Sequence, residues 1–254
     1  MSLLHAEYLK ISRRKLFPVM ALILLFLVVI SAFVLIAFGQ IAPELAEDVP
    51  VLEKPDAYVI GAQQVASQTW FPIILAVVML GGELASTVWA TSLTRDSRRL
   101  AHILSRLTTF TIASWLAFVL GTGLWAAIAF VAAPGSGAPE LIEWLGLLWR
   151  LAAVVVAWTS LGLGAVAMLR SVGPAIGAAL ALAFGEGILG FWGPYENVSL
   201  TAATNGLFGD VLPGGMGAFI QGADLSTAHA LAIIVGWSLL GLGLTYWGLQ
   251  RRDA

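Results

Sequence analysis

The densest group of ionisable side chains is the stretch TRDSRRLAHILSR at residues 94–106. It holds four of the 13 Lys and Arg residues of a chain that is 59% hydrophobic. Guanidinium groups resist transfer across a bilayer, and they bind carboxylates and phosphates through paired hydrogen bonds. The stretch therefore either fixes a connection on one side of a membrane or also binds a partner.

Glu186 is the acidic residue that lies well inside a long apolar run. A carboxyl group at membrane depth is costly and by default indicates a functional site. It could face a substrate path or carry a proton. It could equally be a structural carboxyl bonded to backbone groups or hydroxyls between helices, and both interpretations stay open.

Sites for nucleotides, metals and nucleophilic catalysis are missing from the sequence. The only lysines are Lys10, Lys15 and Lys54, and none follows the glycine loop that cradles phosphates. Ser160 lies in WTSLGLG, which lacks the glycine that rhomboid-type proteases place before the serine, and His229 is expected at a membrane edge. His5, His102 and His229 are widely separated and there are no cysteines, so we expect no catalytic, cofactor or metal site in this chain.

The elements that must position these residues are membrane helices. Soluble domains are about 45–50% apolar and about 25% charged, whereas this chain is 59% hydrophobic and 11% charged. Its apolar runs are long and unbroken, which favours helices over barrel strands. We expect a single all-α integral membrane domain over residues 1–254, with six transmembrane helices at about 17–38, 60–82, 107–132, 145–169, 174–192 and 229–249.

The placement of charge predicts the orientation, because Lys and Arg are retained on the cytoplasmic side. With six spans, one side receives nearly all the basic residues and only Lys54 and Arg150 fall on the other side or at its edge. The retained residues are Lys10, Arg13, Arg14, Lys15, Arg95, Arg98, Arg99, Arg106, Arg170, Arg251 and Arg252. Both termini are therefore expected in the cytoplasm.

Two segments outside the spans also have a predicted form. Residues 1–16 have apolar and charged side chains on opposite faces, which predicts an amphipathic interfacial helix; a charged flank that only fixes orientation is the alternative. Residues 193–228 are half apolar and broken by Gly and Pro, so we expect extracytoplasmic broken helices buried against protein. Gly173 and Gly177, like Gly162 and Gly164, are expected to let helices pack closely within the chain.

The basic stretch itself is expected to be helical. Asp96 or Ser97 could cap its start, and Leu100, Ile103, Leu104 and Leu107 then share one face. Arg99, His102 and Arg106 share another face, so the stretch is an amphipathic approach to the third span.

This region resembles the permease subunits of ABC transporters of the ABC-2 type, with a type V exporter-like membrane domain. Those permeases have an acidic residue at the end of the second span, then Gly-Thr, a short turn, a Ser-Arg pair and a further basic residue. Glu83, Ser86-Thr87, Ser97-Arg98-Arg99 and Arg106 stand at matching places, with Ser86 where glycine is common and Arg106 where lysine is common. The resemblance extends to the basic N-terminal helix, the six spans and the broken outer segment containing VLPGG.

The resemblance implies that the chain is the membrane subunit of an ATP-driven exporter in the cytoplasmic membrane of a prokaryote, and not itself an enzyme. Residues 83–106 would form the coupling segment that docks on a separate ATPase subunit, which binds ATP and Mg. A second permease copy, as a homodimer or a paralogue, would complete the transporter in the lipid bilayer, with no nucleic-acid partner. The implied coupling residues are Glu83, Thr87, Arg95, Asp96, Ser97, Arg98, Arg99, His102 and Arg106. A stand-alone channel or secondary transporter is the alternative, and the substrate is not readable.

Overall fold

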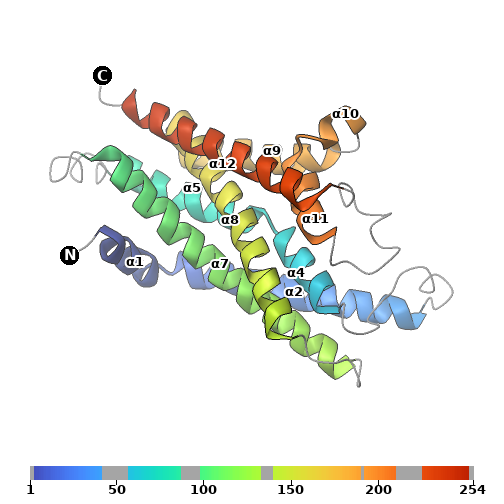
Figure 1. Cartoon of the computed structure of the whole chain (residues 1–254). Coiled ribbons are helices and arrows are strands. Elements are labelled where there is room, and N and C mark those ends of the chain that lie inside the picture. The colour runs from blue at the N-terminus through green and yellow to red at the C-terminus, as the bar shows by residue number, and fades with distance from the viewer. Residues whose placement is uncertain are drawn as a thin grey trace.

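The computed structural model describes residues 3–41, 57–86, 98–132, 140–189, 192–209 and 225–251. Every regular element in these ranges is a helix, as Figure 1 shows. The helices are α1 (Leu3–Arg13), α2 (Leu16–Ile41), α4 (Ala57–Ala66), α5 (Trp70–Ala85), α7 (Arg99–Ala132), α8 (Leu141–Leu169), α9 (Val172–Leu189), α10 (Gly193–Glu196), α11 (Leu200–Gly209) and α12 (Thr227–Gln250). The predicted all-α class is confirmed for this part of the chain.

Among the described residues, five helical segments are long and apolar enough to cross a membrane. They are Leu16–Val34, Tyr58–Ala85, Arg99–Ala132, Leu141–Leu169 and Thr227–Gln250. The predicted span at 174–192 corresponds to α9, whose apolar part Val172–Glu186 is shorter. The chain is therefore a multi-pass helical protein with five candidate spans, and the status of α9 decides whether there is a sixth.

The second predicted span is interrupted. The expected single helix over 60–82 is two helices, because α4 ends at Ala66 and α5 begins at Trp70. Pro72 explains the break, since proline has no N–H to donate and its ring clashes with the carbonyl four residues earlier. The predicted span at 60–82 lies within the candidate span Tyr58–Ala85, but its helix is not continuous.

The connection between α8 and α9 is tight. Arg170 ends α8 in a left-handed conformation with φ of 58°, and its N–H still donates to the Val166 carbonyl. The Arg170 guanidinium donates to the Arg251 carbonyl at 3.2 Å, so this corner lies beside the end of α12.

Helix α8 runs through the centre of the bundle and packs along α12 at backbone distance. A Cβ added at Gly164 would lie 2.9 Å from the Gly241 carbonyl oxygen. A Cβ added at Gly241 would lie 2.5 Å from the Ser160 carbonyl carbon. Small residues allow this approach, as expected for Gly164, whereas Gly173 and Gly177 face open space within the described chain.

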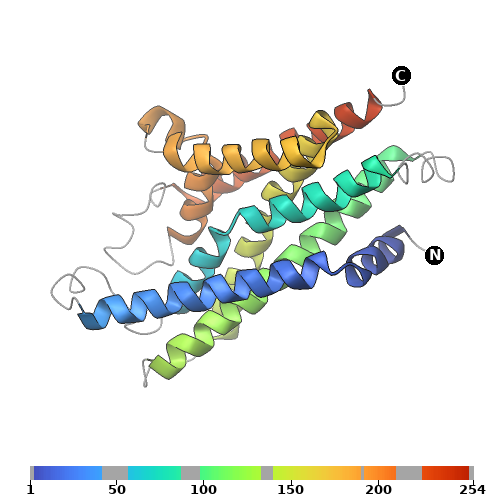
Figure 2. The same cartoon turned by 180° about the vertical axis from the view of Figure 1, so that it is seen from behind.

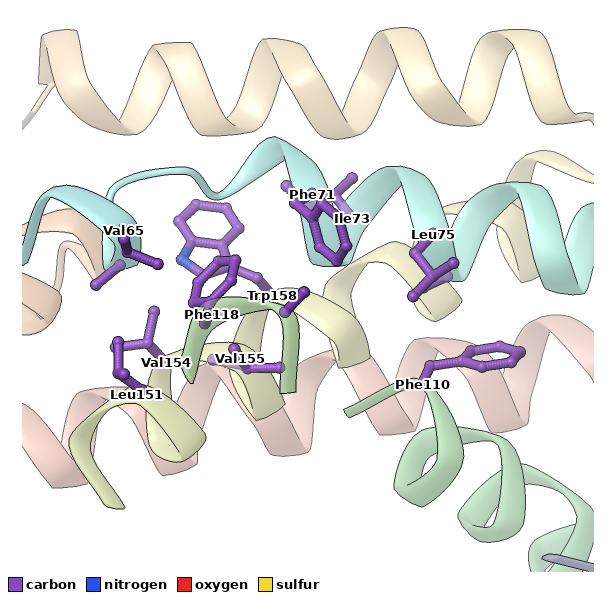
Figure 3. Packing of buried hydrophobic residues seen from close by; sticks show 14 of the residues in the cluster. Val65, Phe71, Ile73, Leu75, Phe110, Phe118, Leu151, Val154, Val155 and Trp158 are labelled. Atoms are coloured by element: carbon purple, nitrogen blue, oxygen red, sulfur yellow. The ribbon is translucent and has the colours of Figure 1, made fainter. Parts of the chain in front are cut away.

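The core and the surface are both apolar, as in a protein solvated by lipid. Aromatic and branched side chains from α4, α5, α7 and α8 interlock around the buried Trp158 in Figure 3. Large apolar side chains also cover the outer face of α2, where Phe33 is 69% exposed and Leu22 is 67% exposed. Such a face is stable against acyl chains and costly in water.

The helix ends that carry the predicted cytoplasmic charges share one end of the bundle. In Figures 1 and 2, α1, the end of α5, the start of α7 and the end of α12 all lie at this end. The opposite end holds the end of α2 and the end of α7. The segments that carry the predicted cytoplasmic charges therefore lie close together in the structure.

Candidate functional site

A cluster of four ionised side chains joins α1, α5 and α7. Glu83 on α5 accepts two hydrogen bonds from Arg106 on α7, from Nη2 at 2.5 Å and from Nε at 2.9 Å. Its other carboxylate oxygen accepts from Lys10 Nζ on α1 at 2.8 Å. Lys10 also bonds Glu7 at 2.9 Å, and Glu7 lies 3.6 Å from Arg106.

The cluster is buried although all four of its members are ionisable. Arg106 is 1% exposed, Glu83 is 2% exposed and Glu7 is 3% exposed. Two carboxylates lie among two cations, which offsets the cost of burying charge, although Glu7 Oε2 has no hydrogen-bond partner among the described residues. Lys10 is the member that reaches the surface, with 30% of its side chain exposed.

Local sequence explains why Glu83 needs two cations. It lies in the last turn of α5, where the unpaired carbonyls give the helix end a negative potential. The Ser86 hydroxyl donates to the Gly82 carbonyl at 2.8 Å and satisfies part of that end. Arg106 and Lys10 offset the remaining repulsion, and Arg106 also donates to the His102 carbonyl at 3.3 Å.

The predicted coupling residues fall into three groups. Glu83, His102 and Arg106 are buried within the chain, so their side chains are not on an open surface. Arg98 is exposed and Arg99 is half-buried at the start of α7. Thr87, Arg95, Asp96 and Ser97, with the predicted helix cap, lie outside the described residues.

The amphipathic start of α7 packs its polar face inward. His102 and Ser105 are buried with Arg106, whereas Leu100 is 58% exposed and Leu104 is 44% exposed. In lipid this direction is favourable, because the apolar side chains meet acyl chains and the charges meet their partners. The predicted apolar face is divided in the structure, because Leu100 and Leu104 are exposed whereas Ile103 is buried in the core beside the polar residues.

Sequence reasoning missed Glu7 and Lys10 as members of the site. The prediction for residues 1–16 gave only a charged face of an amphipathic helix and assigned no contact to either residue. Leu4 and Tyr8 are indeed exposed on α1, at 49% and 63%. The available signal was the acidic Glu7 within a basic helix, because an i, i+3 Glu–Lys pair on one face can complement a second ion pair.

Glu186 has a different environment. It is 1% exposed and accepts hydrogen bonds from the Tyr195 hydroxyl, from Ser199 Oγ at 2.8 Å and from the Leu200 and Thr201 N–H groups at 2.7 and 3.2 Å. The last two donors belong to the N-terminus of α11, where a negative charge is favoured. These hydrogen bonds from Tyr195, Ser199, Leu200 and Thr201 to Glu186 join α9 to the α10–α11 segment, and we call this group the clasp.

The clasp also acts on Tyr195, which lies outside the spans. Burial raises the pKa of the Tyr195 hydroxyl, and the hydrogen bond and the charge of Glu186 act in the same direction. Tyr195 therefore stays protonated and donating across the ordinary pH range.

The serine and histidine considered for protease chemistry, Ser160 and His229, both make contacts with backbone carbonyls. The Ser160 hydroxyl donates to the Ala157 carbonyl at 2.8 Å, one turn earlier in its own helix. At the start of α12, His229 Nε2 lies 3.1 Å from the carbonyl oxygen of Asn197, which follows α10. Within the described ranges, no three His, Cys, Asp or Glu side chains are grouped so that they could share a metal ion.

The charge cluster, in contrast, joins separate elements. Its ion pairs connect α1, the last turn of α5 and the start of α7. Comparison of the chain with protein-family models, curated proteins and solved structures finds no match.

Proposed function

We propose that the chain is the permease subunit of an ATP-driven exporter and that residues 83–106 receive motion from a separate ATPase subunit. The observation that carries this proposal is the Glu83–Arg106 ion pair. This ion pair joins the first and last residues of the segment 83–106, whose pattern resembles a coupling segment. Lys10 bonds Glu83 and Glu7 lies beside Arg106, so the N-terminal helix contacts the same ion pair.

A coupling segment needs an accessible part and a rigid part. Arg98 and Arg99, at the outer end of α7, supply cations for carboxylates of a docked partner. Glu83 and Arg106 supply the rigid part, because separating a buried ion pair leaves uncompensated charge. A push on the segment would then move α5, α7 and α1 together.

The remaining features of the proposal follow from orientation. Six spans, with α9 as the fifth, place both termini and the coupling segment in the cytoplasm, where a soluble ATPase binds ATP and Mg. A second permease copy, identical or paralogous, faces the second ATPase. Closure of the ATPase dimer brings the coupling segments together and shifts the bundles to extrude substrate across a prokaryotic cytoplasmic membrane.

Charge reversal tests the docking role. We expect the double variant Arg98→Glu and Arg99→Glu to insert into the membrane normally but to lose co-purification with the ATPase encoded beside it, or stimulation of ATP turnover. The matched control is Arg170→Glu with Arg251→Glu, which makes the same charge change at the same end of the bundle. Full coupling in the first variant would overturn the assignment of the site.

A second measurement separates the function from the site. If no neighbouring reading frame encodes an ATPase with a phosphate-binding loop, and the purified chain alone moves solute across vesicles, the chain is a channel or secondary transporter. Retained coupling in the Arg98/Arg99 variant, by comparison, contradicts only the assignment of these two residues as the docking site and leaves the exporter function untouched.

A further inference from the structure

The break between α4 and α5 lies within a candidate membrane span, where each backbone polar group needs a partner. An unbroken helix would pair the carbonyls of residues 64–68 with N–H groups four residues later. The break removes those five bonds, and Pro72 has no N–H to supply one of them. Each of these carbonyls therefore needs a substitute donor.

Four of the five carbonyls obtain one. The substitute pairs are Ser67 Oγ with the Gln64 carbonyl, the Gln68 N–H with the Val65 carbonyl, the Thr69 N–H with the Ser67 carbonyl and the Phe71 N–H with the Gln68 carbonyl. Among the hydrogen bonds of the described residues, the Ala66 carbonyl receives none of these replacements. Ala66 is fully buried, so bulk water cannot satisfy it either.

An unpaired donor lies at the same level of the bundle. The indole of Trp158 on α8 is 0% exposed and its Nε1–H has no hydrogen-bond partner. In Figure 3 the ring lies beside the link between α4 and α5, with its nitrogen toward Val65. Helix α8 packs against the first turn of α5, since a Cβ added at Gly162 would lie 2.9 Å from the Ile73 carbonyl oxygen.

We propose that a buried water molecule binds at this break and bridges the Trp158 Nε1–H to the Ala66 carbonyl. The indole only donates and the carbonyl only accepts, and they do not bond directly. A water accepts from the first and donates to the second, which removes two unpaired groups at once. Buried waters in proteins occupy such positions between groups that are otherwise unsatisfied.

The water makes the break a hinge. A bridged carbonyl keeps its partner when α5 tilts slightly against α4, because a water can shift with it, whereas a helical ladder would lose bonds. The inference does not depend on the exporter proposal. It requires only that the break is buried, and it would hold equally in a channel.

Indole NMR on the full-length chain tests the site. Uniform ¹⁵N-tryptophan labelling in detergent micelles gives one indole N–H resonance per tryptophan, and Trp158→Phe or Trp158→Tyr identifies the resonance of Trp158. We expect that resonance to show a cross-peak to water and the downfield shift of a hydrogen-bonded indole. Trp115 is the internal control, because its Nε1–H donates directly to the Leu148 carbonyl at 2.8 Å. We expect Trp115 to be downfield without the water cross-peak.

An unshifted Trp158 resonance without a water cross-peak would overturn the proposal. If exchange broadens the Trp158 resonance beyond detection, an experimental density map that resolves ordered water tests the bridge instead. A density peak within about 3.2 Å of both atoms supports the bridge, and its absence in an otherwise hydrated map refutes it.

Discussion

Glu83 is the residue on which the charge cluster depends, because it bonds both cations. We expect Arg106→Met to lower the free energy of unfolding by about 3–5 kcal/mol, since it leaves buried carboxylates uncompensated. The double variant Glu83→Met with Arg106→Met should recover part of that loss. Thermal unfolding in detergent measures both, and Lys10→Met, at the exposed edge, should cost less. Wild-type stability of the single Arg106 variant would contradict the network.

Glu186 and Tyr195 provide a second test at this scale. Replacing Glu186 with Gln removes the negative charge that Ser199 and the N–H groups of Leu200 and Thr201 contact through Oε2. The amide NH2 then takes the place of Oε1, so the Tyr195 hydroxyl must accept a hydrogen bond instead of donating one. We expect a loss of about 3 kcal/mol, and a smaller loss for Tyr195→Phe, which removes one donor. Unchanged unfolding of Glu186→Gln would show that the clasp contributes nothing.

The pH dependence of the Tyr195 contribution has a definite sign. The pKa of Tyr195 is raised in the folded protein, so the hydroxyl's contribution is complete below the unfolded pKa of about 10 and is lost only above it. The difference between wild type and Tyr195→Phe, measured as the unfolding midpoint, should therefore be constant from about pH 6 to 9. A difference that shrinks within this range would indicate that another group titrates in the clasp.

The sequence identified some of these residues but not their partners. Glu83 was singled out by the resemblance to the ABC-2 permease pattern, Arg106 by that resemblance and by the basic stretch, and Glu186 because a carboxyl group at membrane depth is costly. Glu7 and Tyr195 did not, because their contacts depend on how α1 and α10 dock, and docking angles are not encoded in local spacing. Charged positions were thus predictable, whereas the pairing of charges was not.

Helix α12 offers an element-scale test of packing. Gly241 lies against the α8 backbone, while an added Cβ at Gly243 on the same helix has no described atom within 4 Å. We expect Gly241→Val to push α12 away from α8 and to lower the unfolding midpoint strongly, or to abolish folding. Gly243→Val should be nearly silent, and its expression in the membrane provides the matched control. Equal effects of the two substitutions would show that β-branching, rather than contact, causes the loss.

Helix positions were largely predictable from the runs of apolar residues, and their irregularities were not. The predicted spans at 17–38, 145–169 and 229–249 correspond closely to α2, α8 and α12. The break at Ser67–Thr69 was missed because averaged hydropathy ignores the hydrogen bond that Pro72 removes. The early start of α7 at Arg99 was expected as an amphipathic approach, but the burial of its polar face required the neighbouring helices.

At the scale of the whole molecule, the number of membrane crossings depends on helix α9. Helix α9 has 18 residues and spans about 27 Å, slightly less than the hydrocarbon thickness of about 30 Å. Phe184 and Ile188 are each 73% exposed on it, which favours contact with lipid. The corner at Arg170 and the clasp at Glu186 mark its two ends, and six crossings would put these ends on opposite sides.

The chain contains no cysteine, so single cysteines can report the side of each connection without a background. We expect Ser171→Cys, before α9, and Ser12→Cys to be protected from a membrane-impermeant maleimide in intact cells and labelled after permeabilisation. Asn197→Cys, after α9, should be labelled in intact cells. All three side chains are exposed in the folded chain, so protection reports the membrane rather than burial. Labelling of Ser171→Cys and Asn197→Cys on the same side would show that α9 does not cross. That result would place the C-terminus outside the cell, away from any cytoplasmic ATPase, and would require the exporter topology to be abandoned.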